Sequence, residues 1–176
     1  AKHCTFVNNT GRTEAPGGIT LHGNADGATT AQIRIENSLI GHTGEWGDPL
    51  SYTEISVFPG ADTVVTHSNL NGGWPGTGNI NVNPRFTNPR EDAHVKDVMP
   101  QWYRLRADSP ARNAAGPGDA DADFFGNPRP FGALPDMGFF EFTDSDNDGM
   151  PDDWERENGL DPLDPEDATG DSDLDG

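Results

Sequence analysis

The chain has 176 residues, a hydrophobic content of 32%, 22 glycines, 15 prolines and a formal net charge of −19, which suits one medium domain with or without a small appendage. Without a basic stripe to neutralise phosphates, this charge argues against nucleic acid and against an anionic membrane surface as partners. No apolar run approaches the roughly 20 residues that a membrane span needs.

Short runs of alternating apolar and polar residues fill the first ninety positions. Gly, Asn, Asp and Pro separate these runs, and no sustained helical period accompanies them. Period-two runs between turn-forming residues indicate β-strands. The expected strands are residues 3–9, 17–23, 31–40, 52–58, 62–70 and 79–86.

The expected strands carry a weak internal repeat. Cys4 and Ser38 lie 34 residues apart, Ser38 and Ser68 lie 30 apart, and Ile19 and Ile55 lie 36 apart. A repeat of this size with two or three short strands is typical of parallel β-helix coils, in which equivalent small side chains stack and apolar ones fill the interior. The alternative is an antiparallel sandwich in which the similarity is accidental.

Residues 87–140 contain many turn-forming residues and few strand patterns. Within them, "YRLRADSPARNAAGPGDADADFFGNPRP" and "PDMGFFEF" resemble the C-terminal closing segment, of the choice-of-anchor type, of secreted bacterial right-handed β-helix proteins. The resemblance covers residues 63–142 and departs from the family pattern at Asn113 and Phe139. The matching positions are Tyr103, Leu105, Ser109, Pro110, Ala111, Gly116, Asp121, Gly126, Pro128, Arg129, Asp136, Gly138, Phe140 and Glu141.

This resemblance implies an all-β fold, with about three coils of right-handed parallel β-helix and an irregular C-terminal cap. An open coil end exposes apolar side chains and unpaired strand edges, so a cap needs apolar cover. The residues expected to supply that cover are Phe124, Phe125, Phe131, Phe139 and Phe140.

An acidic stretch, "DSDNDGMPDDWE" at 144–155, follows the closing segment. Residues 141–176 hold fifteen Asp or Glu and one arginine, a composition that also suits a disordered acidic tail. However, the stretch fills every specified position of the calcium-loop rule D-x-[DN]-x-[DN]-G-x5-E, with Gly149 at the sharp turn. The rule predicts carboxylate ligands at Asp144, Asp146, Asp148, Asp152 and Glu155, and a backbone carbonyl ligand at Met150, for a small EF-hand-like calcium loop.

The surroundings of this loop differ from those of an EF-hand. A strand pattern at 137–143 precedes it, and helix formers at 151–158 with a stop at Gly159 follow it. Residues 143–176 resemble the thrombospondin type 3 calcium repeats of secreted bacterial proteins, and the terminal "DSDLDG" matches the start of a second loop. Further predicted ligands are Asp171, Asp173 and Asp175 in that second loop, and Asp161, Asp164 and Asp167 are candidates for a shared second ion.

The sequence leaves catalysis open. It has no nucleophile elbow, phosphate loop, zinc pattern or redox cysteine pair, and the single Cys4 excludes an intrachain disulfide. The β-helix resemblance implies polysaccharide lyase or hydrolase chemistry, which needs a basic residue or paired carboxylates on adjacent coils. The candidates are His22, Arg34, Glu36, His42, Glu45, Asp48, Glu54, His67 and Lys96, although an ion pair explains Arg34 and Glu36 equally well.

Three tryptophans, Trp46, Trp74 and Trp102, are candidate carbohydrate-binding residues. Trp46 and Trp74 lie in loops rich in glycine, and Trp102 precedes a tyrosine. Exposed tryptophans stack on sugar rings, but they also cover the flank of a fold. The sequence supports both interpretations.

These observations predict three regions and one favoured function. We expect a secreted, calcium-stabilised structural or adhesive module, either the C-terminal part of a longer surface protein or a subunit that stacks head to tail through its N-terminal coil into a fibre. The alternative is the C-terminal part of a secreted carbohydrate-active enzyme with catalysis upstream. The expected regions are coils at 1–90, a closing segment at 91–142 and a calcium-binding repeat at 143–176.

Overall fold

The computed structural model describes residues 1–7, 19–21, 31–41, 55–57, 61–87, 100–117 and 121–169. The chain divides into two compact units, Ala1–Glu141 and Phe142–Gly176, which we call the first unit and the second unit. No helix in the described part of the chain is long and apolar enough to cross a membrane.

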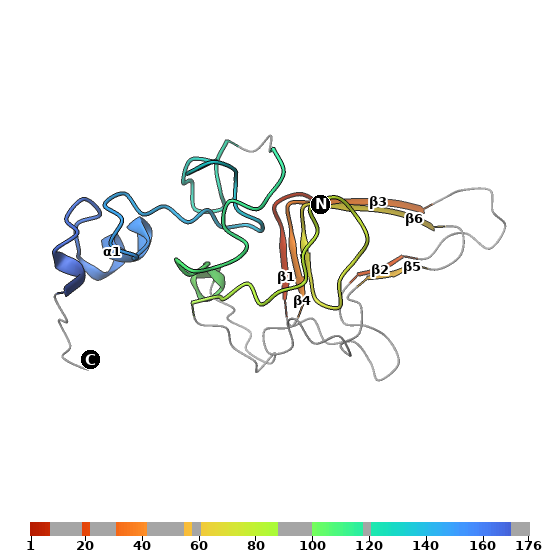
Figure 1. Ribbon diagram of the computed structural model, residues 1–176, viewed down its shortest axis with the longest axis horizontal. Helices are drawn as coiled ribbons and strands as arrows, with labels where there is room; N and C mark the ends of the chain where they lie inside the picture. Colours follow the sequence, from red (N-terminus) through yellow and green to blue (C-terminus); the bar gives the residue numbers. More distant parts are fainter. Residues whose placement is uncertain are drawn as a thin grey trace. The chain divides into compact units, whose positions relative to one another are not determined.

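Short parallel strands organise the first unit (Figure 1). They pair into three small sheets, with strand orders β1-β4-β7, β2-β5 and β3-β6. The strands are β1 (Thr5–Val7), β2 (Ile19–Leu21), β3 (Ala31–Glu36), β4 (Leu39–Gly41), β5 (Ile55–Val57), β6 (Ala61–Thr66) and β7 (Asn69–Leu70).

The strand registers confirm the predicted repeat distances. Neighbouring strands are offset by 34 residues in β1-β4, by 36 in β2-β5 and by 30 in β3-β6 and β4-β7. The internal repeat therefore reports which residues lie side by side in parallel pairs. The first pair of each register is Thr5↔Leu39, Ile19↔Ile55, Ala31↔Ala61 and Leu39↔Asn69.

The predicted fold class, an all-β right-handed parallel β-helix of about three coils, is wrong. The strands have two to six residues, each sheet has two or three strands, and the described residues form no closed sheet or solenoid. A repeat in the sequence fixes the register between neighbouring strands, but it does not make successive sheets close into coils. The expected strand at 79–86 is also absent, since only isolated bridges at Ile80 and Phe86 occur there.

Two predicted strands, 31–40 and 62–70, are each broken in the middle. Asn37 has φ 54° and His67 has φ 47°, so the backbone turns out of the extended region at both positions. The Asn37 side chain accepts a hydrogen bond from the Gly116 N–H at 2.8 Å and donates one to the Gly116 carbonyl at 3.4 Å, which holds this turn in place. After the turn, the Ser38 N–H donates to Ser68 Oγ at 3.1 Å.

A small apolar core lies between the strands of the first unit. Its members alternate with exposed residues, as in β6, where Val65 is 2% exposed and Val64 is 39% exposed. Burial of this kind, through the hydrophobic effect, is the main stabilising contribution available to such short strands. The core consists of Ile35, Ile40, Ile55, Val65 and Leu70, with Phe6, Ile19, Ile33 and Trp74 packed against it.

The rest of the first unit has little regular structure. A 3-10 helix, η1 (Pro100–Tyr103), places Tyr103 edge-on against Phe86, with ring centroids 5.4 Å apart. Deeper inside, Arg129 forms a buried ion pair with Glu141 at 3.2 Å. Of the phenylalanines expected to cover an open end, Phe140 is buried and Phe124 is 68% exposed.

One short helix, α1 (Asp152–Asn158), lies in the second unit and fits the helix expected at 151–158 (Figure 1). Gly159 ends it in the left-handed conformation at φ 81°, as the sequence predicts. A second 3-10 turn, η2 (Asp167–Thr169), follows. The strand expected at 137–143 is not formed.

Candidate metal centre

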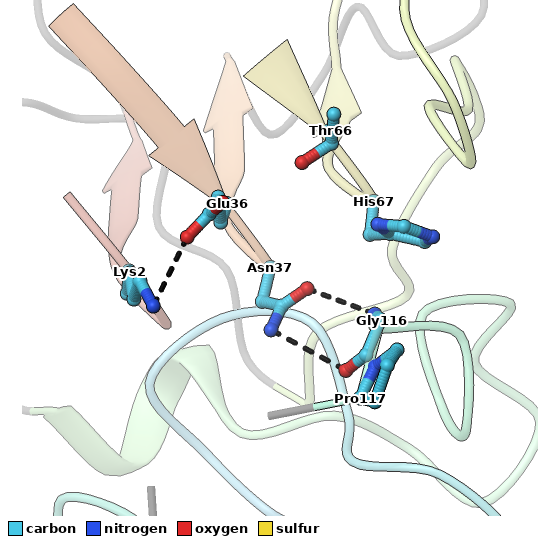
Figure 2. A pocket seen from close by; sticks show the side chains of 7 residues that line it. All are labelled: Lys2, Glu36, Asn37, Thr66, His67, Gly116 and Pro117. Carbon is cyan, nitrogen blue, oxygen red and sulfur yellow. Dashed lines mark hydrogen bonds and ion pairs between the residues drawn. The ribbon is translucent and has the colours of Figure 1, made fainter. Parts of the chain in front are cut away.

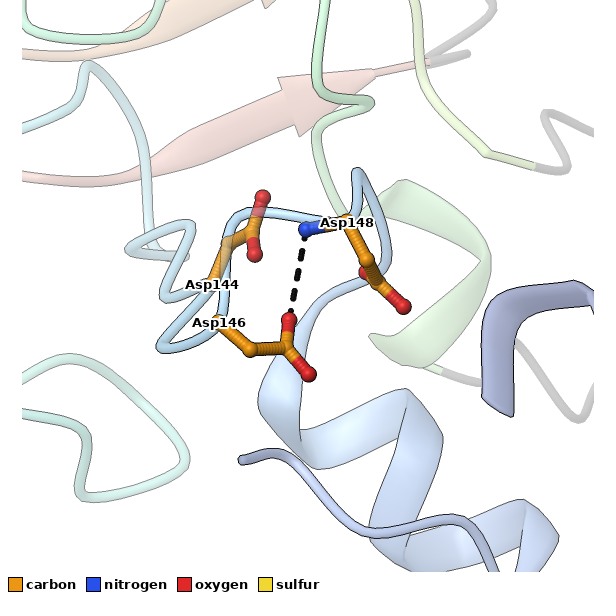
Figure 3. Close-up of side chains that lie close together, drawn as sticks. All are labelled: Asp144, Asp146 and Asp148. Atoms are coloured by element: carbon orange, nitrogen blue, oxygen red, sulfur yellow. Dashed lines mark hydrogen bonds between the residues drawn. The ribbon is translucent and has the colours of Figure 1, made fainter. Parts of the chain in front are cut away.

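The acidic loop of the second unit is folded back by its own carboxylates. Asp144 Oδ2 accepts a hydrogen bond from the Gly149 N–H at 3.3 Å. Asp146 Oδ1 accepts one from the Asp148 N–H at 3.2 Å, which Figure 3 draws as a dashed line. Gly149 has φ 102°, a conformation that side chains other than glycine rarely tolerate. Asp144 and Asp146 therefore each use one carboxylate oxygen to accept a hydrogen bond from the loop backbone, and the other oxygen accepts none.

Carboxylates from three places converge in the second unit. Oxygens of Asp144, Asp146 and Asp148 lie within 4.8 Å of one another (Figure 3). Oxygens of Asp148, Glu155 and Asp167 also lie within 4.8 Å of one another. Asp148 belongs to both groups, so the loop, α1 and η2 share one acidic cluster. We call these five residues the acidic cluster.

The acidic cluster holds six buried oxygens that accept no hydrogen bond. Glu155 is 0% exposed, and neither of its carboxylate oxygens has a partner. A buried carboxylate without a partner is costly because it loses its hydration and gains nothing in return. The other four are Asp144 Oδ1, Asp146 Oδ2, Asp148 Oδ2 and Asp167 Oδ1.

The electrostatics of the cluster favour a bound positive charge. Burial, followed by repulsion from the neighbouring aspartates, raises the pKa of Glu155 to about 7. Burial also raises the pKa of Asp146, and the nearby Asp148 and Asp144 add to that rise. Two carboxylates about 5 Å apart repel by roughly 3 kcal/mol at an effective dielectric constant of about 20.

Calcium fits this set of ligands. It takes six to eight oxygens and prefers carboxylates, and the cluster offers six unpartnered carboxylate oxygens. The residues that would hold it are Asp144, Asp146, Asp148, Glu155 and Asp167. A calcium ion would supply two positive charges to a cluster of five carboxylates, and so remove most of their repulsion.

Asp152, which the loop rule also predicts as a ligand, is engaged elsewhere. Its Oδ1 accepts from the Ser145 N–H at 2.7 Å, and its Oδ2 accepts from Ser145 Oγ at 2.8 Å. Arg156 lies 3.4 Å from the same Oδ2. Asp152 belongs to neither group of converging carboxylates, and its contacts tie the start of the loop to α1.

The remaining predicted ligands stay predictions. The Met150 N–H donates to Asp148 Oδ1 at 2.7 Å, which places this residue in the loop without testing its carbonyl as a ligand. The second-loop residues Asp171, Asp173 and Asp175 lie outside the described residues.

Asp167 joins the cluster although the loop rule does not include it. It lies twelve residues beyond Glu155, and the sequence suggests it only as one of three aspartates that could add ligands to a shared second ion. Its Oδ2 accepts a hydrogen bond from the Asp161 N–H at 2.8 Å, which turns the segment after α1 back toward the loop. No spacing rule predicts this approach, because it depends on that tertiary turn.

Two catalytic candidates, Glu36 and His67, line a pocket in the first unit (Figure 2). The pocket measures about 320 Å³ and lies where β3 and β6 end. It is lined by Lys2, Glu36, Asn37, Thr66, His67, Gly116 and Pro117.

The pocket residues are held by structural contacts. Arg34 hydrogen-bonds Glu36 at 2.8 Å and Lys2 lies 3.1 Å from it, and together they hold the pKa of Glu36 below its usual range. A proton donor needs the opposite shift. The His67 ring packs against Gly116, where an added Cβ would lie 2.6 Å from His67 Nδ1. These contacts favour the ion-pair interpretation of Arg34 and Glu36.

Two of the three candidate tryptophans lie in the described part of the chain, and most of the other catalytic candidates lie outside it. Trp74 packs against the apolar core, and Trp102 is partly buried in η1. Of the residues proposed for catalysis or sugar binding, those outside the described part of the chain are His22, His42, Glu45, Trp46, Asp48, Glu54 and Lys96.

Comparisons of the chain with models of protein families, with curated proteins and with solved structures found no match.

Proposed function

We propose that this chain is a calcium-stabilised structural or adhesive module of an extracellular protein, in which the second unit binds the ion. The observation that carries the proposal is Glu155, a fully buried carboxylate with two unpartnered oxygens that faces Asp148 and Asp167. A buried, negatively charged group of this kind is stable only when a cation or a proton neutralises it.

The extracellular location is part of this proposal. Calcium sites of extracellular modules bind in the range of about 0.1–1 mM, so a site that binds weakly is filled where calcium is plentiful. The net charge of −19 also suits a protein that meets high concentrations of divalent cations. A structural role agrees with the contacts of Glu36 and His67, which are engaged in an ion pair and in packing.

Isothermal titration calorimetry of the chelator-treated chain tests the proposal. We expect calcium to bind at about pH 7.5, and magnesium to bind more weakly because it retains its water ligands. Glu155→Gln removes the buried charge and should abolish calcium binding. Glu157→Gln makes the same change at an exposed position of α1 and should leave binding unchanged. A wild-type chain that takes up no calcium at millimolar concentration would exclude the proposed function.

A further inference from the structure

The segment that follows α1 reaches back to the calcium loop through one residue. Gly159 turns the chain at the end of α1, and the Leu160 N–H donates to the Glu155 carbonyl at 2.9 Å. Further along, Asp167 Oδ2 accepts from the Asp161 N–H at 2.8 Å. These contacts bring a carboxylate oxygen of Asp167 within 4.8 Å of carboxylate oxygens of Asp148 and Glu155.

Asp167 Oδ1 is buried and accepts no hydrogen bond. Glu155, in the same group of carboxylates, is 0% exposed and equally unpartnered, so two independent side chains of this group each carry a buried oxygen that accepts no hydrogen bond. Electrostatic repulsion among these three carboxylates would drive their segments apart, because no covalent link holds Asp167 near the loop.

We propose that Asp167 is a ligand of the loop cation from outside the twelve-residue loop, so that cation binding fastens residues 160–169 onto the loop and α1. This inference rests on the proposed calcium site and adds a ligand and a structural consequence to it. One ion bound by Asp148, Glu155 and Asp167 explains the convergence without a second site. Binding energy then becomes folding energy for the segment after α1.

The test compares Asp167→Asn with Glu166→Gln in the full chain. Asp167→Asn keeps an oxygen that accepts from Asp161 but removes the charge, whereas Glu166→Gln changes an exposed neighbouring carboxylate. We expect Asp167→Asn to weaken calcium binding about tenfold in calorimetry, since ligand charge sets affinity at such sites. Glu166→Gln should bind calcium as the wild type does.

Amide hydrogen exchange measured by NMR tests directly whether calcium orders residues 160–169 against the loop and α1. In the wild type, calcium should slow exchange at the loop amides of Gly149 and Met150 and also at Leu160 and Asp167, which donate to backbone carbonyls. In Asp167→Asn, calcium at a saturating concentration should still protect the loop amides but not those beyond α1.

The outcomes separate this inference from the proposed function. Unchanged affinity and unchanged protection in Asp167→Asn would overturn the inference while the loop site stands. A wild type that binds two ions, of which Asp167→Asn loses one without weakening the other, would also overturn it. If the wild type binds no calcium, both the inference and the proposed function fail.

Discussion

Glu155→Gln should change the stability of the second unit in opposite directions with and without calcium. Glutamine has nearly the same shape as glutamate, but it carries no charge. In the metal-free protein the substitution relieves a buried carboxylate of its repulsion from the surrounding aspartates. In calcium it removes the one ligand residue that offers two unpartnered oxygens.

The magnitude follows from the pKa of Glu155, which burial and its acidic neighbours raise to about 7 from an ordinary value of 4.5. A folded-state pKa above the unfolded one means that the folded state binds the proton more tightly. Stability therefore falls as the pH rises from about 4.5 through 7, by at most about 3 kcal/mol. In chelator, Glu155→Gln should be more stable than the wild type by up to that amount at pH 8 and by almost nothing at pH 4.

With calcium bound, the wild type should be more stable than Glu155→Gln, the reverse of the order in chelator. A ligand at one hundred times its dissociation constant stabilises the folded state by about 2.7 kcal/mol, and Glu155→Gln should lose this gain. The assay is hydrogen exchange of the Asp152 and Glu155 amides, whose backbone hydrogen bonds measure 2.9 and 3.0 Å, because their exchange reports the opening of the second unit. A variant less stable than the wild type in chelator at pH 8 would refute the reasoning, and Glu157→Gln is the matched control.

Three further predictions concern the first unit and are measured by urea denaturation. Arg129→Ala leaves Glu141 buried without its ion-pair partner and should lower the free energy of unfolding by about 3–5 kcal/mol. Adding Glu141→Gln should restore part of this loss, and a loss under about 1 kcal/mol would contradict the prediction. Gly76→Ala should lower the free energy of unfolding by about 1–3 kcal/mol, since its Cβ would lie 2.0 Å from the Val65 carbonyl oxygen. A variant as stable as the wild type would contradict the close packing of Gly76 against Val65. Glu36 has a lowered pKa, so its contribution to stability is fully present above about pH 4.5 and is lost as the pH falls through the lowered folded-state pKa; Glu36→Gln should cost at most about 1 kcal/mol at pH 7 and progressively less as the pH falls below about 4.5, and a cost independent of pH would contradict this.

The parts of the molecule that the sequence predicts well depend on residues close together in the chain. Asp144, Asp146, Asp148 and Glu155 lie within one turn and one short helix, so their spacing is enough to bring their carboxylates together. The C-terminal stop at Gly159 is equally local, because a left-handed residue is needed there whatever surrounds it.

The parts that the sequence does not predict depend on distant contacts. Asn37 and His67 adopt positive φ. Both residue types are enriched in that region, but residue type alone does not show that the strand pattern around them is interrupted there. For Asn37 the reason lies 79 residues away, in two hydrogen bonds to Gly116. The repeat distances predict strand pairing but not closure, because closure also depends on the segments between the strands, whose lengths differ between repeats.

The burial in the second unit links its fold to its chemistry. Among its described residues, Phe142 is the one large hydrophobic side chain that is buried, whereas Thr143, Asp144, Asp152 and Glu155 are buried polar or charged residues. Apolar burial within the unit therefore offsets only part of the conformational entropy lost by ordering its loop and helix. A helix of seven residues is also too short to be stable alone in water. A cation bound to the acidic cluster would remove the repulsion and add stabilisation at the same time, so part of the free energy of metal binding should appear as folding stability of this unit.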